Sequence, residues 1–295
     1  ILSMGVMDPN DFFRGRLEFF DKKMKPKLLI DSLQRPVSFN RADLNGDGLE
    51  DIIICAFGNY TGALLVYEQR PSGTYKKHVV SYLPGARKVY IRDMDENGLP
   101  DIVALFTQGD EQIQLLKNFG DFNFRVQTLL RFPSAYGSSF FEFADMNGDG
   151  REDIIYSNGD NADYSKILKP YHGIRIFLSK GNTEFIESWF YPMHGASQVT
   201  AQDFDGDGDL DLAASSFFPD WSNAPAFGFV YLERQSGGLN FKPYVTPLAA
   251  RGRWMTMASA DLNKDRHPDL VLAALNFNNG VPARVGDTWD EQTAS

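Results

Sequence analysis

Five short acidic loops, spaced almost evenly along the chain, constrain its fold more than any other feature of the sequence. They begin at residues 43, 93, 145, 203 and 261, so that successive starts are 50, 52, 58 and 58 residues apart. Each loop carries Asp or Asn at positions 1, 3, 5 and 9, and four of the five carry glycine at position 6. A unit that recurs at this spacing and is bounded by strand-like runs is typical of a propeller blade.

The spacing of these oxygen-bearing side chains suits a hard cation. Ca²⁺ takes about six to eight oxygen ligands, and a tightly wound loop turns every second side chain inward. Glycine at position 6 lets the chain turn where other residues would be strained, and the carbonyl of position 7 supplies a further oxygen. We therefore expect up to five Ca²⁺ sites. The predicted ligands, loop by loop, are Asp43, Asn45, Asp47, Leu49 and Asp51; Asp93, Asp95, Asn97, Leu99 and Asp101; Asp145, Asn147, Asp149, Arg151 and Asp153; Asp203, Asp205, Asp207, Asp209 and Asp211; and Asp261, Asn263, Asp265, His267 and Asp269.

Two other interpretations of the loops compete with calcium binding. An EF-hand requires a bidentate Glu at position 12, whereas these loops place their acidic residue at position 9 and continue directly into an apolar run. Position 12 is Ile54, Ala104, Tyr156, Ala214 and Leu272 in the five loops. The second interpretation is a set of turns that bind nothing, since Asp, Asn and Gly also favour plain turns. Five loops in the same register count against it.

Four strand-like segments recur around each loop, in the order A, loop, B, C, D. Strand B is almost wholly apolar, as expected for a strand covered on both faces, and strand D is the outermost. The A segments include residues 37–42 and 199–202, and the B segments are 51–57, 101–106, 153–157, 211–215 and 269–275. The C segments are 62–68, 113–117, 173–179 and 228–233, and the D segments are 75–82, 124–132, 185–190 and 241–245.

The fold class predicted is all-β, a β-propeller of four-stranded antiparallel blades in one domain or domain fragment spanning residues 1–295. Four blades are complete and two are partial. The complete blades cover about 37–83, 87–132, 139–191 and 198–246, and the partial blades cover 1–35 and 254–295. Because residues 1–4, 15–20 and 27–33 form a B, C, D series without an acidic loop, we favour part of a seven-bladed ring. A closed five-bladed ring is the alternative.

The loops and their strands resemble the FG-GAP/VCBS repeats of bacterial extracellular proteins and of integrin α-chain propellers, over roughly residues 15–275. Residues 57–58 (Phe-Gly) and 62–63 (Gly-Ala) fit the family's motif loosely, and residues 136–219 resemble a subgroup of uncharacterised bacterial VCBS-repeat proteins. The resemblance implies a propeller, Ca²⁺ in the A–B loops and secretion, but no single activity. Glu96 replaces one usual glycine, and Lys264 and Arg266 replace both glycines of the fifth loop. We therefore expect the fifth site to be strained and the weakest.

The charge of the chain limits its partners. The net charge of −10 argues against nucleic acid and anionic membranes as partners. The sequence contains no run of eighteen apolar residues, so it predicts no membrane-spanning helix. Positions 1, 3, 5 and 9 of the loops hold 16 carboxylates, so five bound Ca²⁺ would bring the formal charge to about zero. The single cysteine, Cys55, lies in an apolar run and is expected to be a buried small hydrophobe. We expect an extracellular, periplasmic or cell-surface protein.

A binding surface is expected on the face opposite the acidic loops, where the B–C and D–A turns lie. Long B–C segments at residues 158–172, 217–227 and 276–290 bring aromatic residues there. Trp221 is the predicted anchor, because its neighbours mark an exposed loop tip. The alternative is that these aromatics pack the long loops onto the blades. The candidate ligand-binding residues are Arg87, Tyr136, Tyr164, Tyr171, His172, His194, Trp221 and Arg253.

The sequence thus predicts a secreted calcium-binding propeller that acts as a non-catalytic protein- or glycan-interaction module, within a larger chain or assembly. The alternative is a carbohydrate-active lyase or hydratase on the same scaffold. That would require His172 or His194 to lie within hydrogen-bond reach of a carboxylate such as Asp160, Asp163 or Asp220. A deep polar pocket with converging His, Arg and Asp would favour the enzyme, and a flat aromatic surface would favour binding.

Overall fold

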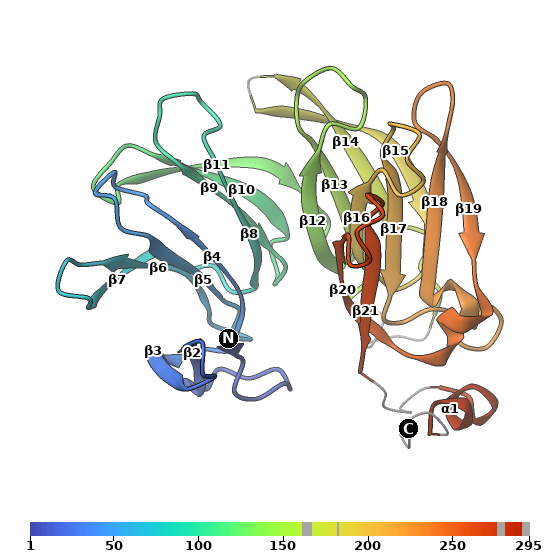
Figure 1. Cartoon of the computed structure of the whole chain (residues 1–295), viewed down its shortest axis with the longest axis horizontal. Coiled ribbons are helices and arrows are strands. Elements are labelled where there is room, and N and C mark those ends of the chain that lie inside the picture. The colour runs from blue at the N-terminus through green and yellow to red at the C-terminus, as the bar shows by residue number, and fades with distance from the viewer. Residues whose placement is uncertain (161–166, 182, 276–280, 291–295) are drawn as a thin grey trace. The chain divides into compact units, whose positions relative to one another are not determined.

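The computed structural model describes residues 1–160, 167–181, 183–275 and 281–290 (Figure 1). The chain divides into two compact units, Ile1–Ser134 and Ala135–Ser295. Each unit is built from successive antiparallel sheets, and each sheet contains strands that follow one another directly along the chain. The fold is therefore all-β with propeller-like blades, as the sequence predicts.

The first unit contains one three-stranded and two four-stranded sheets. Their strands lie side by side in chain order, and all neighbours are antiparallel. The first sheet is β1 (Leu2–Ser3), β2 (Gly15–Phe20) and β3 (Pro26–Leu33). The second is β4 (Pro36–Ala42), β5 (Asp51–Ala56), β6 (Ala63–Gln69) and β7 (Tyr75–Ser81). The third is β8 (Ala86–Arg92), β9 (Asp101–Phe106), β10 (Gln112–Asn118) and β11 (Phe124–Arg131).

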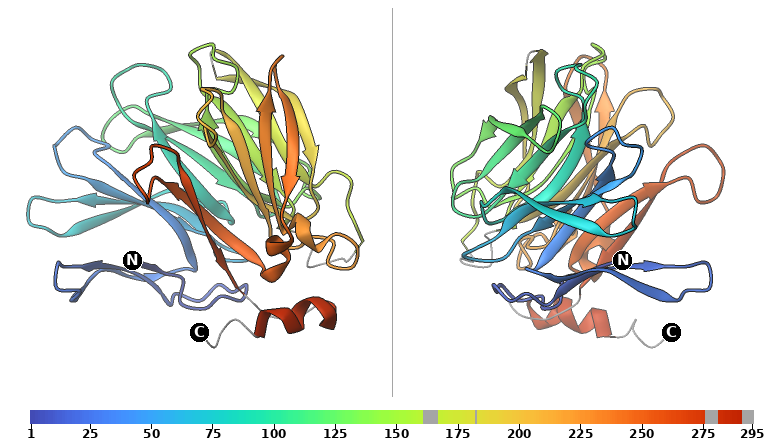
Figure 2. Two further views of the ribbon diagram at one scale, coloured as in Figure 1. Left: turned by 45° about the vertical axis from the view of Figure 1, so that its right-hand side comes forward. Right: turned by 90° about the vertical axis from the view of Figure 1, so that its left-hand side faces the viewer.

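The second unit contains two four-stranded sheets, a two-stranded sheet and a short helix. The four-stranded sheets are twisted (Figure 2). The first is β12 (Ser138–Ala144), β13 (Asp153–Asn158), β14 (Gly173–Gly181) and β15 (Glu184–Pro192). The second is β16 (Ala196–Gln202), β17 (Asp211–Ser216), β18 (Phe229–Gln235) and β19 (Asn240–Val245). The two-stranded sheet is β20 (Trp254–Ala260) and β21 (Asp269–Ala274). The 3-10 helices η2 (Pro225–Gly228) and η3 (Pro247–Arg251) and the helix α1 (Ala283–Asp290) complete the unit.

The cores lie between sheets that are neighbours in sequence. Every residue of the B strands β5, β9, β13 and β17 is buried, because these strands have a paired strand on each side and another sheet against their faces. Strand β21 is half-exposed instead, since no C strand pairs with it in the described residues. Cys55 lies within β5 with no exposure, and burial raises the pKa of its thiol to about 12. The prediction of a buried cysteine is confirmed.

One predicted element is wrong. Residues 276–290 were expected to be a B–C loop, whereas residues 283–290 form the helix α1. In the part of the chain that the structure describes, no helix has the length and apolar character needed to cross a membrane.

Candidate metal loops and a histidine–aromatic cluster

All five acidic loops share one backbone conformation. The residues at positions 4 and 6 have positive φ in every loop, between 57° and 95°. At Gly46 and Gly48 of the first loop, a Cβ atom would meet nothing within 4 Å. A side chain therefore has room at these positions, and its cost is backbone strain alone. Glu96, Lys264 and Arg266 carry that strain, with φ of 57°, 66° and 76°.

The carboxylate at position 1 closes each loop by accepting backbone N–H groups. In the first loop, Oδ1 of Asp43 accepts from Gly46 (2.8 Å) and Asp47 (3.1 Å), and Oδ2 accepts from Gly48 (2.8 Å). In the fifth loop, Asp261 accepts the corresponding bonds from Lys264 (2.7 Å), Asp265 (3.1 Å) and Arg266 (3.0 Å). The loss of both glycines therefore leaves the hydrogen-bond pattern of the loop intact.

The Asp at position 9 fastens the loop to its sheet. Asp51 accepts the N–H of Leu44 at 3.1 Å on one oxygen and that of Gln69, at the end of β6, at 2.9 Å on the other. Burial raises the pKa of Asp51, Asp101 and Asp153, and neighbouring loop carboxylates raise it further, against the opposing effect of the backbone hydrogen bonds. Asp269 keeps its bond from Leu262 but is half-buried, because no C strand lies beside β21 among the residues that the structure describes.

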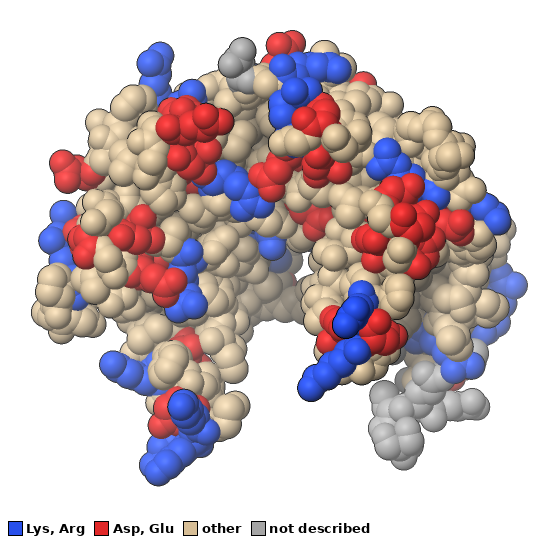
Figure 3. Space-filling model, turned by 45° about the horizontal axis from the view of Figure 1, so that its top comes forward, with Lys and Arg blue, Asp and Glu red and all other residues tan. Residues whose placement is uncertain are grey.

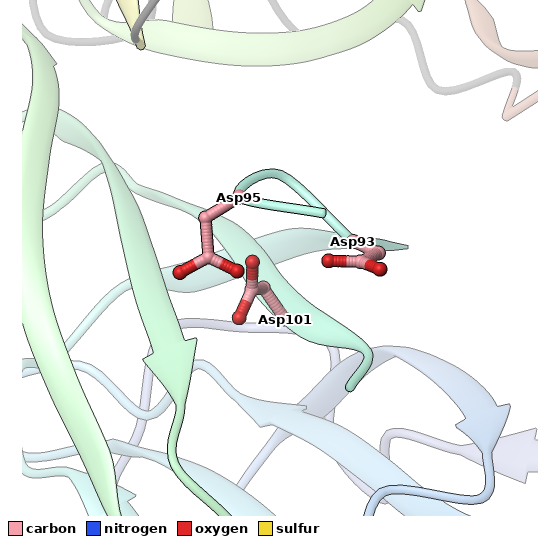
Figure 4. A group of neighbouring side chains, drawn as sticks. All are labelled: Asp93, Asp95 and Asp101. Atoms are coloured by element: carbon pink, nitrogen blue, oxygen red, sulfur yellow. The ribbon is translucent and has the colours of Figure 1, made fainter. Parts of the chain in front are cut away.

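Two of the loops gather three carboxylate oxygens at a separation that fits a cation. In the second loop, oxygens of Asp93, Asp95 and Asp101 lie within 4.8 Å of one another (Figure 4). In the fourth loop, oxygens of three Asp residues at positions 1, 3 and 5 do the same. An ion that binds oxygens at about 2.3–2.6 Å can bridge such a set. Asp and Glu side chains form several separate patches on the face drawn in Figure 3.

In three loops, the Asn side chain at position 3 donates a hydrogen bond to the carboxylate at position 5. In the first loop, Nδ2 of Asn45 donates to Oδ2 of Asp47 at 3.1 Å, and the third and fifth loops have the same bond at 3.0 and 2.9 Å. In the third loop, the guanidinium of Arg151 also pairs with Asp149. These groups occupy hydrogen-bonding sites of the position 5 carboxylate, and Arg151 also compensates its charge. The second and fourth loops carry Asp at position 3 and gather their carboxylates most closely.

On the B–C side of the second unit, two of the predicted binding residues stack on each other. The rings of His172 and His194 are 5.2 Å apart with an interplanar angle of 21°, and Tyr171 meets His172 edge-on at 5.4 Å. His172 is 1% exposed. Burial, with the nearby His194, Lys169 and Arg175, lowers the pKa of His172 to about 3, and burial lowers that of His194 as well. Both imidazoles are therefore neutral at physiological pH.

The expectation that Trp221 is an exposed anchor is wrong. Trp221 is 7% exposed and Arg253 is 2% exposed. The Trp221 ring meets the ring of Trp289 edge-on at 5.4 Å, and the guanidinium of Arg253 lies 5.5 Å from the Trp221 ring centre. Trp289 belongs to α1 and donates from Nε1 to the carbonyl of Ala250 at 2.8 Å. The helix covers the loop tip, so Trp221 and Arg253 pack the loop rather than face solvent.

Comparison with known families identifies the repeats. The family described as FG-GAP-like repeat matches residues 43–104 and 93–156, a span that includes the first three acidic loops. The chain contains FG-GAP-like repeats. The family assignment made from the loops and their strands is thereby confirmed. Among curated proteins, none matches the chain.

Solved structures resemble the chain in fold at low identity. The V. cholerae biofilm matrix protein Bap1 is 16% identical, with 95% of this chain and 39% of Bap1 covered and a TM-score of 0.47. The chain thus spans well under half of Bap1. The Malassezia sympodialis allergen Mala s 1 is 11% identical, with coverage of 95% and 90% and a TM-score of 0.51. BBS1N, in its complex with ARL6DN, is 12% identical with a TM-score of 0.46, and 94% of this chain and 77% of BBS1N are covered. The likeness to Mala s 1 is one of fold alone.

The remaining predicted residues around the FG-GAP-like repeats lie in different places. Tyr136 stacks on Tyr171 at 5.5 Å and so extends the cluster of Tyr171, His172 and His194, called here the histidine cluster. Arg87 is a half-buried residue of β8 in the first unit, and Tyr164 lies outside the described residues. The sequence analysis missed Arg175, which is 4% exposed and lies 4.6 Å from the ring centre of Tyr136. A cation in the middle of the apolar run of β14 was the signal that could have found it.

Proposed function

We propose that this chain of FG-GAP-like repeats is a secreted, calcium-stabilised module that binds a protein or glycan and has no catalytic role. One observation carries the calcium part of the proposal. Five loops with different sequences share the same positive-φ positions and the same hydrogen bonds from positions 4, 5 and 6, or from most of them, to the Asp at position 1. A conformation kept even where it strains Lys264 and Arg266 is more than a plain turn requires.

The side chains at positions 1, 3, 5 and 9 and the carbonyl at position 7 would hold the ion. A bound Ca²⁺ supplies positive charge where three or four carboxylates otherwise repel one another. Within the chain, the position 9 Asp links the loop to the sheet. Because Asp101 accepts N–H groups from Met94 in the loop and Asn118 in β10, it ties the loop to the middle of the blade. Ordering the loop therefore stabilises the sheet.

The test of the calcium proposal is thermal unfolding with and without chelator. A ligand that binds only the folded state stabilises it by mass action, so we expect the melting temperature to fall by several degrees in EGTA. Added Ca²⁺ should restore it better than Mg²⁺. Asp93→Asn is the site variant, and Asp110→Asn, at an exposed Asp outside the loops, is its control. Equal melting curves with and without EGTA would refute the proposal.

The non-catalytic part rests on the histidine cluster. His172 is buried and stacked on His194, so it offers no accessible acid–base group, and its low pKa keeps it from serving as an acid near neutral pH. No observation on the described residues favours the lyase alternative over the binding module.

The proposed location follows from the proposed calcium sites. Extracellular modules bind Ca²⁺ with dissociation constants of about 10⁻⁴–10⁻³ M, and such sites fill outside the cytosol. Fractionation of the native cell tests the proposal, and recovery of the protein in the cytosolic fraction would overturn it.

A further inference from the structure

A groove in the first unit has the features of a ligand site. The first two sheets share an apolar core that includes Ile30 of β3 and Ile54 and Tyr67 of the second sheet. Towards the outer strands this core gives way to a groove of about 410 Å³, a volume within the usual range for small-molecule sites. Its walls are Lys27, Leu28, Leu29, Ile30 and Asp31 of β3 on one side, and Tyr67, Gly73, Thr74 and Tyr75 on the other.

Two tyrosines give the groove its chemistry. The residue Tyr67 is 8% exposed, and Tyr75 is half-buried. Neither phenol hydroxyl has a hydrogen-bond partner among the described residues, although a buried tyrosine hydroxyl usually finds one. Both tyrosines line the groove. Burial raises the pKa of both phenols, and both therefore keep the proton that they can donate.

Charged and polar groups lie around this aromatic and aliphatic floor. Lys27, Asp31 and Thr74 are exposed at the groove, and Lys27 forms no ion pair with another described residue. The floor is apolar where Leu29, Ile30 and the tyrosine rings meet. A ligand that fits such a groove has one apolar face and many hydroxyl groups.

We propose that the groove between β3 and the start of β7 binds a neutral pyranose ring of a glycan. The C–H face of the sugar packs on the tyrosine rings and on Leu29, and its hydroxyl groups bond to the two phenols, Lys27 and Asp31. This proposal rests on the proposed interaction role and names the partner class for this surface. The acidic net charge of −10 favours a neutral sugar over a polyanionic one.

An extended peptide is the competing occupant, and strand β3 is poorly suited to it. β3 begins with Pro26 and Lys27, which are residues that protect sheet edges from further pairing. Its pairing with β2 contains two register shifts, between Gly15 and Leu17 and between Leu17 and Glu18. Irregular pairing bends the strand, and an added strand needs a straight row of backbone groups.

The experiment measures glycoside binding to the full chain in Ca²⁺-containing buffer, by saturation-transfer NMR and by titration calorimetry. The probes are the methyl pyranosides of glucose, galactose, mannose and N-acetylglucosamine, with a poly-alanine peptide as the competing class. We expect at least one glycoside to bind. Tyr67→Phe and Tyr75→Phe should each weaken its binding by about fivefold, since each removes one hydroxyl hydrogen bond and keeps the ring. The control is Tyr82→Phe at a residue that is 81% exposed, and it should change nothing.

Absence of binding by all four glycosides, or binding that both Tyr→Phe variants leave unchanged, would overturn the proposal, as would preferential binding of the peptide. The melting temperature of each sample with and without EGTA is recorded alongside. A normal response to EGTA with no sugar binding refutes the groove alone, whereas no response to EGTA refutes the calcium proposal and leaves the result on the groove valid.

Discussion

Individual residues in the fifth loop show what the shared loop conformation costs. Lys264 and Arg266 have φ of 66° and 76°, where a non-glycine residue is strained by about 1–2 kcal/mol. The corresponding Gly46 and Gly48 have open space around them, so glycine fits without repacking. We expect the double variant Lys264→Gly, Arg266→Gly to increase the free energy of unfolding by about 1 kcal/mol, after the entropic cost of glycine in the unfolded chain.

The measurement is urea denaturation in Ca²⁺ buffer, with the reciprocal change as its control. Gly46→Lys with Gly48→Arg, in the first loop, should lower the free energy of unfolding by a similar amount. The same two pairs should shift Ca²⁺ binding in the same directions. Unchanged stability in both double variants would mean that the positive φ values carry no strain.

His172 makes stability depend on pH at the residue scale. Its pKa is about 3 in the folded protein against an ordinary value of 6.5. Below pH 6.5 the unfolded chain binds a proton that the folded chain does not, so stability falls as the pH falls. Between pH 7 and pH 5 the loss is about 2 kcal/mol. Urea denaturation at both pH values should show this loss in the wild type and most of it abolished in His172→Gln. An equal loss of unfolding free energy in both proteins would mean that a group other than His172 takes up the proton.

At the scale of elements, the sequence predicts the strands correctly wherever they belong to a repeat. The apolar runs predict the B strands, and β5, β9, β13 and β17 each begin at the position 9 Asp, as expected. The helix α1 was missed, because it lies outside the repeat and its eight residues form too short a stretch for a clear helical period. The turn residues around Trp221 predict an exposed loop tip, and this prediction is wrong because a tertiary contact from the distant helix α1 buries the ring.

The contact between α1 and the loop of Trp221 leads to an element-scale prediction. Trp221, Val285 and Trp289 form one buried cluster. A helix of eight residues is not stable alone, so this cluster holds α1 in place. We expect Trp221→Ala to destabilise the second unit by about 3 kcal/mol, measured by urea denaturation, and to raise acrylamide quenching of the fluorescence of Trp289.

The control for this variant is Leu248→Ala, at a residue of η3 that is 56% exposed, and it should change stability by less than about 0.5 kcal/mol. If Trp221→Ala were as mild as the control, the helix would not depend on the tryptophan pair.

At the scale of the whole molecule, the net charge of −10 arises largely from the acidic loops, which hold 16 carboxylates at positions 1, 3, 5 and 9. Among the described residues, two carboxylates at positions 1, 3, 5 and 9 form ion pairs. Arg151 pairs with Asp149, and Lys117 lies 4.0 Å from Asp95. Without Ca²⁺ the carboxylates of each loop therefore repel one another across short distances, and dissolved salt is the remaining source of screening. The screening length falls from about 30 Å at 0.01 M to about 3 Å at 1 M salt.

We therefore expect NaCl to substitute in part for Ca²⁺. In EGTA, the melting temperature should rise by several degrees between about 0.01 M and about 1 M NaCl, because that range spans the change in screening length. With Ca²⁺ bound, the loop charges are already compensated, and the same salt should raise it by less than half as much. NaCl is preferred to sulfate, which strengthens apolar burial in any protein. Calorimetric scans in the four conditions give the answer. Parallel salt dependences with and without Ca²⁺ would show that repulsion within the loops does not limit the stability of the chain, and that the ion acts there only as a local tie.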